Sequence, residues 1–185
     1  MQPTLIIRVK NKCTTMLSDT TLYFRWIKII TVGSLALMSF LIFIGNTTNY
    51  YANYYFVEHV MKMDTIFPNS ELQYRSIHQP WIYHVGYVVI ILLELAMAWF
   101  CIQGSREMFV KRREPAAVFY EAKRRAVIGL GIGILIWFTG FEVVGGEWFA
   151  MWQSSTWNGL ESTNRIILFE MLVLILLFMR EPEYA

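Results

Sequence analysis

Four apolar stretches alternate with polar connections along the chain. A helix of about 20 apolar residues crosses the roughly 30 Å hydrocarbon core of a bilayer. Three of the stretches reach that length, and the fourth does so if residues 162–165 add its first turn. The pattern therefore predicts an all-α, polytopic membrane protein with four transmembrane helices, which cover about residues 23–44, 81–102, 126–144 and 163–179.

The placement of Lys and Arg predicts the orientation of these helices. The connection 45–80 contains only Lys62 and Arg75, and residues 145–164 contain no basic residue. Cytoplasmic loops carry an excess of Lys and Arg, so we expect both termini and residues 103–125 to be cytoplasmic. The supporting residues are Arg8, Lys10, Lys12, Arg25 and Lys28 near the N-terminus, and Arg106, Lys111, Arg112, Arg113, Lys123, Arg124 and Arg125 in the connection 103–125.

A single membrane domain accounts for most of the 185 residues. We expect a cytoplasmic N-terminal segment at residues 1–22, the membrane domain at 23–180, and a cytoplasmic tail at 181–185. The first apolar stretch is longer than the apolar core of a cleaved signal peptide, and no small-residue cleavage site follows it. It is therefore predicted to be an uncleaved anchor.

The first outer connection begins with a run of amides and tyrosines at residues 46–55. Tyr is favoured at the membrane interface, so the run indicates an aromatic belt or, alternatively, a surface for sugars or lipid headgroups. Residues 56–67 then place apolar side chains on one helical stripe. They predict a short amphipathic helix on the outer surface that ends before Pro68.

Three carboxylates lie within the apolar stretches, where a central charge costs roughly 2.5–3.5 kcal/mol on insertion scales. Glu94, Glu142 and Glu170 form an intramembrane polar set with Arg165 and His84. We expect Arg165 to pair with Glu142 or Glu170, and Glu94 to bond a tyrosine or a backbone carbonyl. The set fits either a structural polar core or a proton, ion or substrate site.

Small residues on the third stretch predict a close helix contact. Gly129 and Gly133 form a small-xxx-small pair, and Gly140 extends the same α-helical face. Glu142 lies on a different stripe of that helix. If Glu142 faces the bundle, the glycine face is free to meet another helix, either of this chain or of another subunit.

The second outer connection contains three tryptophans within ten residues. We expect residues 46–67 and 145–159 to pack together, because both are aromatic and too apolar to stay in water. Apolar walls with a few polar groups are typical of a ligand or partner site, whereas membrane anchoring is the alternative. The predicted periplasmic binding face comprises Glu58, His59, Asp64, Glu147, Trp148, Trp152, Gln153, Trp157 and Asn158.

The sequence lacks the motifs that are typical of several classes of function. His59, His78 and His84 do not have the spacing of paired metal ligands, so no metal is expected. No phosphate-binding glycine loop or nucleophile–base motif occurs. The only cysteines, Cys13 and Cys101, fall on the predicted cytoplasmic side, which excludes quinone-linked thiol oxidases with exofacial cysteine pairs. We expect no cofactor, although a lipid or quinone is possible, and no nucleic-acid partner.

Distinctive strings in both outer connections carry a family resemblance. They are Asn49-Tyr50-Tyr51-Ala52-Asn53, Phe56-Val57-Glu58-His59-Val60, Met63-Asp64-Thr65, Gly145-Gly146-Glu147-Trp148-Phe149, Met151-Trp152-Gln153-Ser154 and Trp157-Asn158-Gly159. Over about residues 20–180, the chain resembles a bacterial family of predicted small integral membrane proteins, a domain of unknown function. The resemblance implies a four-span fold in the bacterial inner (cytoplasmic) membrane. It implies no activity, so no catalytic residues carry over.

The leading hypothesis is a non-enzymatic inner-membrane accessory or assembly subunit. It would bind a membrane-protein partner or a lipid through the periplasmic aromatic face, and a homo-oligomer is an alternative to the membrane-protein partner. One alternative is a small proton-coupled transporter or redox accessory that uses Glu94, Glu142 and Glu170. Another is a membrane-embedded enzyme linked to a lipid or quinone. The sequence leaves these hypotheses open.

Overall fold

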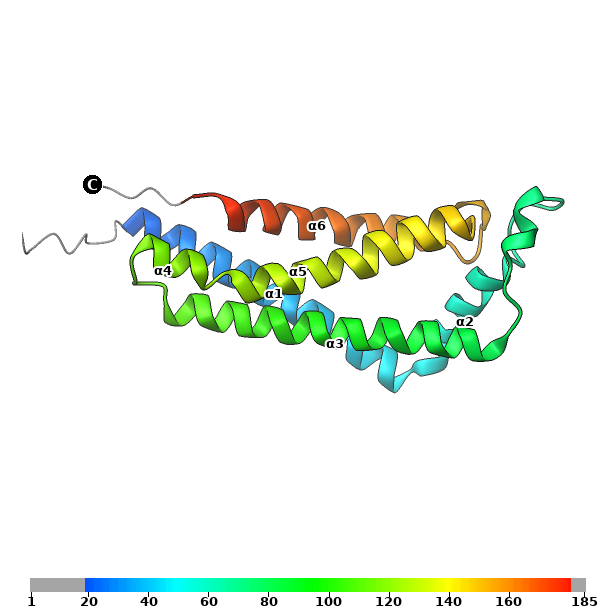
Figure 1. Ribbon diagram of the computed structural model, residues 1–185, viewed down its shortest axis with the longest axis horizontal. Helices are drawn as coiled ribbons and strands as arrows, with labels where there is room; N and C mark the ends of the chain where they lie inside the picture. Colours follow the sequence, from blue (N-terminus) through cyan, green and yellow to red (C-terminus); the bar gives the residue numbers. More distant parts are fainter. Residues whose placement is uncertain (1–18, 181–185) are drawn as a thin grey trace, which may run out of the picture.

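The computed structural model describes residues 19–180, and within them it consists of helices and connections with no strand. Four long helical segments lie side by side along the long axis of the molecule, and shorter helices occupy the two ends (Figure 1). The expectations for residues 1–18 and 181–185 lie outside this range. The long segments are α1 (Asp19–Thr48), α3 (Pro80–Val110), α5 (Arg124–Ile134) with its continuation η2 (Leu135–Trp148), and α6 (Leu160–Phe178).

Three of these segments are long and apolar enough to cross a membrane, namely Asp19–Thr48, Pro80–Val110 and Ala116–Trp148. α1 and α3 extend beyond the predicted spans 23–44 and 81–102, because hydropathy marks only the apolar part of a helix. The 19-residue α6 carries Glu161, Arg165 and Glu170. The short elements are α2 (Tyr50–Lys62), η1 (Glu71–Arg75), α4 (Ala116–Glu121) and η3 (Met151–Gln153).

The helix in the first connection is displaced from its expected position. α2 begins at Tyr50, so it includes most of the amide and tyrosine run, and it ends at Lys62 instead of continuing to residue 67. Met63 follows in the left-handed region with φ 53° and donates its backbone N–H to the Val60 carbonyl. The C-cap at Met63 therefore ends the helix well before Pro68, the residue at which the sequence pattern predicts its end.

Gly129 and Gly133 of α5 face the inside of the bundle. A Cβ atom on Gly129 would lie 2.5 Å from Cys101 Sγ on α3, and one on Gly133 would overlap the Glu170 carboxylate on α6. Gly104 of α3 similarly leaves room for the Ala126 backbone. The expectation that the glycine face points away from the acids, toward another subunit, is therefore wrong for Gly129 and Gly133.

A change of helix type explains the error. From Leu135 onward the helix has π geometry, which contains more residues per turn than an α-helix. Seven residues no longer return to the same face, so Gly140 is exposed although Gly133 is buried. Gly131, Leu135 and Phe138, the stripe expected to face the bundle with Glu142, are exposed as well.

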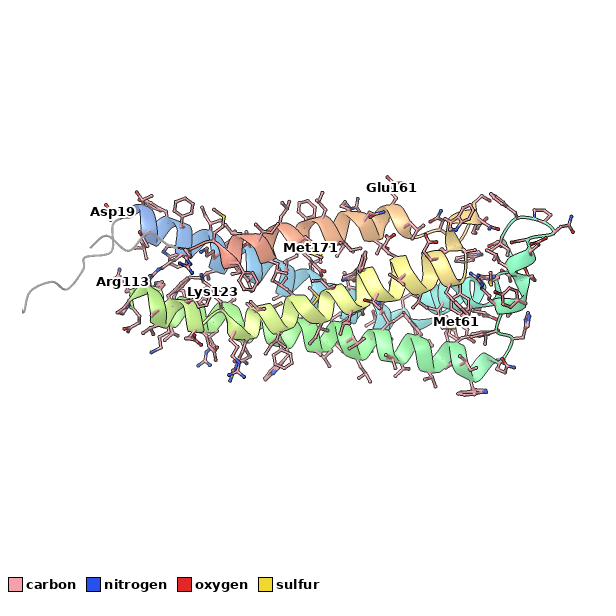
Figure 2. The ribbon with its side chains drawn as sticks, turned by 45° about the horizontal axis from the view of Figure 1, so that its top comes forward. Asp19, Met61, Arg113, Lys123, Glu161 and Met171 are labelled. Carbon is pink, nitrogen blue, oxygen red and sulfur yellow. The ribbon has the colours of Figure 1, made fainter. Side chains whose placement is uncertain are left out.

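At one end of the bundle, three buried cations bind backbone carbonyls. We call it the basic end, and Figure 2 shows Lys123 there, opposite the end that contains Met61. Cations near a helix C-terminus satisfy carbonyls that have no helical partner. The bonds join Arg25 to the Arg112 and Glu114 carbonyls at 3.0 and 2.6 Å, Lys28 to Met179 O at 2.8 Å, and Lys123 to Leu177 O at 3.0 Å.

Two of these cations also contact an aromatic ring. The Arg25 guanidinium lies 4.5 Å from the centroid of Phe119, and Lys123 Nζ lies 5.4 Å from it. Arg25 and Lys28 are each 1% exposed, so they do not extend from the helix to the surface. They join α1 to the α3–α4 connection and to the end of α6.

Gly129→Ala and Gly131→Ala make the same change two residues apart on α5. Ala is favoured over Gly in a helix by about 1 kcal/mol, and a Cβ on Gly131 meets open space. Gly131→Ala should therefore preserve or raise stability. Gly129→Ala forces α3 and α5 apart, and overpacking typically costs about 1–3 kcal/mol. We expect only Gly129→Ala to lower the thermal midpoint of helical circular dichroism in detergent. Equal midpoints would contradict the close approach at Gly129.

Candidate functional site

A buried asparagine joins three helices at the end opposite the basic end. Asn46, in the last turn of α1, donates its Nδ2 to both carboxylate oxygens of Glu94 on α3, each at 2.9 Å. Its Oδ1 accepts a 2.6 Å hydrogen bond from Asn53 on α2, and its carbonyl accepts one from the Tyr87 hydroxyl at 3.3 Å. We call Asn46, Asn53, Tyr87 and Glu94 the Asn46 network.

The expectation that Glu94 bonds a tyrosine or a backbone carbonyl is therefore wrong. Its carboxylate binds the Asn46 amide, and neither a tyrosine nor a backbone carbonyl takes that role. The Glu94 backbone carbonyl also accepts a 2.8 Å bond from Ser39 of α1. An amide has two donor hydrogens and one acceptor oxygen, so Asn46 is suited to link an acid with a second amide.

A cavity of about 280 Å³ adjoins the Asn46 network. Five elements supply its walls, which are mostly apolar with polar groups from the network and from the start of α6. Trp137 of η2 is one wall, and its indole Nε1 is buried without a hydrogen-bond partner among the described residues. The lining residues are Ile42, Asn46, Asn53, Phe56, Val57, Tyr87, Ile90, Glu94, Trp137, Phe141, Gly159, Ser162, Thr163 and Ile166.

The unpartnered indole distinguishes this cavity from ordinary helix packing. Most buried side-chain donors in proteins have a hydrogen-bond partner, and an exception requires an explanation. Trp137 is 7% exposed, and its neighbour Phe141 stacks against it with ring centroids 5.3 Å apart. Apolar walls with a few convergent polar groups are the usual form of a small-molecule site.

Two segments pack together over this cavity and form what we call the cap. They are α2 with residues 63–67, and residues 145–159. The His59 ring stacks on Trp157 with centroids 4.6 Å apart and planes 8° apart. Thr65 and Ser154 share a 2.7 Å hydrogen bond between their hydroxyls. A Cβ on Gly159 would lie 3.0 Å from the Phe56 ring. The expected contact between the two connections is confirmed.

Further contacts bring more of the predicted binding face together. Asp64 accepts from His59 Nδ1 at 2.8 Å. Gln153 Oε1 accepts from the backbone N–H of Phe67 at 3.2 Å, and Trp152 meets the Phe67 ring edge to face at 5.8 Å. These residues hold the cap together, and Trp152 is 49% exposed.

Other predicted residues have local roles. Glu58 pairs with Lys62 one turn away on α2, and this hydrogen bond raises the pKa of the Lys62 ammonium. Asn158 Oδ1 accepts from the backbone N–H of Leu160 at 3.1 Å, at the start of α6.

A residue that sequence reasoning passed over joins Glu147 and Trp148 to the first connection. Arg75 donates to both of their backbone carbonyls at 3.3 Å, and its guanidinium lies 5.0 Å from the Trp148 centroid. As one of only two cations in the connection 45–80, Arg75 was available to sequence analysis as a candidate.

The remaining intramembrane polar residues lie in separate places. His84 is exposed on α3, where it stacks on Tyr54 at 4.3 Å and bonds the Tyr50 hydroxyl at 2.9 Å. Arg165 is exposed and pairs with neither Glu142 nor Glu170, so the expected ion pair is wrong.

The two other embedded acids differ in burial. Glu170 is fully buried against Gly133, and neither of its carboxylate oxygens has a hydrogen-bond partner in the part of the chain that the structure describes. Glu142 is half-buried, with one unpartnered oxygen. Between residues 19 and 180, no three His, Cys, Asp or Glu side chains are grouped closely enough to hold a metal ion.

A double-mutant cycle at Asn46 and Glu94 tests the central bond of the network. Glu94→Gln keeps an acceptor for the Asn46 amide and should be nearly neutral. Glu94→Leu leaves that amide unpaired and should cost about 1–3 kcal/mol. If the two side chains interact, Asn46→Leu combined with Glu94→Leu should cost less than the sum of the single changes. Unfolding in detergent measures the four proteins of the cycle and the Glu94→Gln variant, and strictly additive losses in the cycle would contradict the contact.

Comparison with known proteins identifies the family to which this chain belongs. No curated protein and no solved structure matches the chain. A family model described as predicted small integral membrane protein (DUF2165) matches residues 24–180. This range contains the long helices apart from the first five residues of α1, and it includes the Asn46 network and the cap. The chain therefore belongs to the family of predicted small integral membrane proteins, in agreement with the resemblance seen in its sequence.

Proposed function

We propose that the chain crosses the bacterial inner membrane four times, with α6 as the fourth span. α6 packs beside η2, α5 and α1, and its central acid, Glu170, is buried against Gly133 rather than exposed to lipid. Arg165 lies within the first two turns, where a long cationic side chain reaches the interface. These features support a transmembrane path for α6 despite its three charged residues.

The same proposal orients the molecule. The basic end and residues 103–125 would face the cytoplasm, and the cap would face the periplasm, because Lys and Arg concentrate on the cytoplasmic side of membrane proteins. α2 would then be the amphipathic helix of the outer surface. Its exposed Tyr51 and Tyr55 suit the membrane interface.

We propose that the protein is a non-enzymatic accessory protein that binds the polar head of a membrane amphiphile in the cavity beneath the cap. The observation that carries this proposal is the buried Trp137 Nε1, a donor with no hydrogen-bond partner between residues 19 and 180, on a side chain that lines a cavity with apolar walls. Because an indole N–H is a donor only, the ligand must present a hydrogen-bond acceptor.

Other groups around the cavity favour the same ligand chemistry. The Asn53 amide lines the cavity, where it donates to Asn46 and hydrogen-bonds the Tyr87 side chain. Glu94 and Ser162 supply polar atoms on other walls. A quinone carbonyl or a lipid ester fits donors of this kind, while the apolar walls suit the adjoining ring or chain.

The geometry gives less support to a proton-coupled transporter. Such a protein needs its acids connected, yet no hydrogen bond between described residues joins Glu94 to Glu142 or Glu170. Gln at all three positions would remove proton transfer while keeping side-chain size. If a cellular phenotype depended on these acids as a relay, it would be lost in this triple variant, and an unchanged phenotype would exclude the relay.

Single-cysteine accessibility tests the four-span topology. In a chain with Cys13→Ser and Cys101→Ala, we introduce Asn69→Cys, Glu114→Cys, Asn158→Cys or Arg180→Cys one at a time. A membrane-impermeant maleimide applied to intact cells should label positions 69 and 158 and leave 114 and 180 unlabelled until the membrane is opened. Labelling of positions 158 and 180 from the same side would show that α6 does not cross.

Ligand recovery tests the proposed binding function. The full chain is purified from its own membranes in mild detergent, and bound lipids and quinones are identified by mass spectrometry. Trp137→Phe removes the donor but keeps the wall, so binding should weaken about 2- to 10-fold, from the roughly 0.5–1.5 kcal/mol of one hydrogen bond. Ser162→Phe should fill the cavity and abolish recovery.

Trp99→Phe provides the matched control, because Trp99 is 60% exposed on α3 and does not line the cavity. Its recovered ligand should match that of the unchanged chain. If the Trp137→Phe and Ser162→Phe variants retained as much ligand as the unchanged chain, the proposal would be contradicted. A stoichiometric protein partner recovered without any amphiphile would contradict it too, and would favour docking through the cap.

A further inference from the structure

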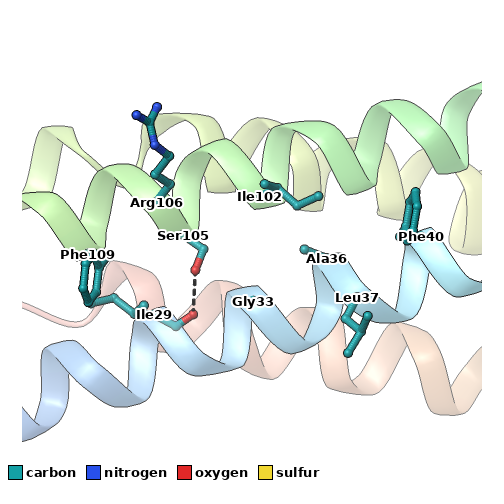
Figure 3. Close-up of a pocket in the computed structure, with 9 residues that line it drawn as sticks. All are labelled: Ile29, Gly33, Ala36, Leu37, Phe40, Ile102, Ser105, Arg106 and Phe109. Carbon is teal, nitrogen blue, oxygen red and sulfur yellow. Dashed lines mark hydrogen bonds between the residues drawn. The ribbon is translucent and has the colours of Figure 1, made fainter.

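A second concave site lies at the basic end, between α1 and α3. It is an open groove of about 460 Å³ whose walls are almost entirely apolar. Figure 3 shows Gly33 and Ala36 on the α1 side of the groove and Ile102 on the α3 side. Leu37 and Ile102 on opposite walls are 58% and 45% exposed. The groove and the cavity beneath the cap share no lining residue.

A hydrogen bond fixes the inner part of the groove. Ser105 of α3 donates to the Ile29 carbonyl of α1 at 3.0 Å (Figure 3). A Cβ on Gly33 would lie 3.3 Å from the same Ser105 hydroxyl, so the absence of a side chain there keeps the groove open. The bond also sets Arg106, the next residue, at the level of the Lys28 and Ile29 turn.

Basic side chains lie at this end of the groove. Arg106 stands on the α3 wall with its guanidinium extended away from α1 (Figure 3). It has no hydrogen bond or ion pair with another residue between 19 and 180. Six residues further along the chain, the Arg112 guanidinium covers the lining residue Phe109 at 4.0 Å from the ring centroid. Trp26 meets the same ring at 5.5 Å.

The length of the groove matches one leaflet of a bilayer. Its α1 wall runs from Ile29 to Phe40, which is roughly 16 Å at a rise of about 1.5 Å per residue. Half of a hydrocarbon core of about 30 Å is about 15 Å. An acyl chain that starts at Arg106 would therefore lie along the groove and end near the middle of the membrane.

We propose that this groove binds one acyl chain of an anionic phospholipid, with the headgroup phosphate bound by Arg106. A guanidinium binds phosphate through parallel N–H donors, and basic residues close to a membrane attract anionic headgroups. Apolar walls of one-leaflet length select a lipid chain, and the charge at one end selects the headgroup. The site does not depend on the cavity beneath the cap.

Photo-crosslinking identifies what occupies the groove. Benzoylphenylalanine is placed at Leu37, and the full chain is reconstituted in vesicles of phosphatidylglycerol and phosphatidylcholine at a 1:4 ratio. Leu172 of α6 is the control position, because it is 53% exposed and absent from the groove. Mass spectrometry should show phosphatidylglycerol adducts enriched several-fold over the vesicle ratio at position 37, and at the vesicle ratio at position 172.

Two charge variants then test the role of Arg106. Arg106→Gln should return the adducts at position 37 to the vesicle ratio. Arg113→Gln removes the same charge from an exposed residue outside the groove and should preserve the enrichment. Adducts at the vesicle ratio in the unchanged chain, enrichment that survives Arg106→Gln, or an adduct with a second copy of the chain would each overturn the proposal.

Discussion

The hydrogen bonds from Asn46 to Glu94 determine the arrangement of the whole cap end. A carboxylate buried among apolar helices is costly unless its oxygens are bonded, and here one amide bonds both. This contact fixes where α1 ends along α3. The Asn46 Oδ1 atom accepts a hydrogen bond from Asn53 and so positions α2. α2 in turn carries Phe56 and His59, against which Trp157 of the second connection packs.

At the basic end, buried polar groups are also bonded by side chains, but there the acceptors are backbone carbonyls and the donors are cations. Backbone groups that lose their helical partners must be satisfied within the protein where water is scarce. Lys28 and Lys123 bond carbonyls at the end of α6, and Arg25 bonds carbonyls of the α3–α4 connection. The two ends are therefore fixed by side-chain bonds, while glycines determine how closely α3, α5 and α6 approach between them.

Sequence periodicity predicted the long helices well, because a run of apolar residues has few alternatives in a membrane protein. It did not identify the partner of Glu94, since Asn46 begins a polar run that also fits an interfacial belt. It assigned the wrong face to the Gly129 and Gly133 pair, because an α-helical period was extended across the π-helical segment that begins at Leu135. Helix type depends on packing, which a hydropathy pattern does not contain.

The cap shows a similar division between what a sequence contains and what it omits. Two aromatic outer connections were expected to pack together, and the stacking of His59 on Trp157 confirms it. The individual bonds were not predictable, because residues 63–70 and 154–159 lack the regular period that would place one side chain relative to another. Arg75 illustrates this, since it bonds the backbone carbonyls of Glu147 and Trp148, and a bond to a backbone carbonyl leaves no signal in the sequence.

Solid-state NMR of the chain in lipid vesicles tests the Asn46 network most directly. With ¹⁵N-labelled asparagine and ¹³C-labelled glutamate, the structure predicts a through-space cross peak between the Asn46 side-chain nitrogen and the Glu94 carboxyl carbon. The assignment follows from loss of that peak in the Glu94→Gln variant, whose residue 94 is not labelled. Absence of any asparagine–glutamate side-chain peak in a sample with intact helices would contradict the network and the position of the cap that depends on it.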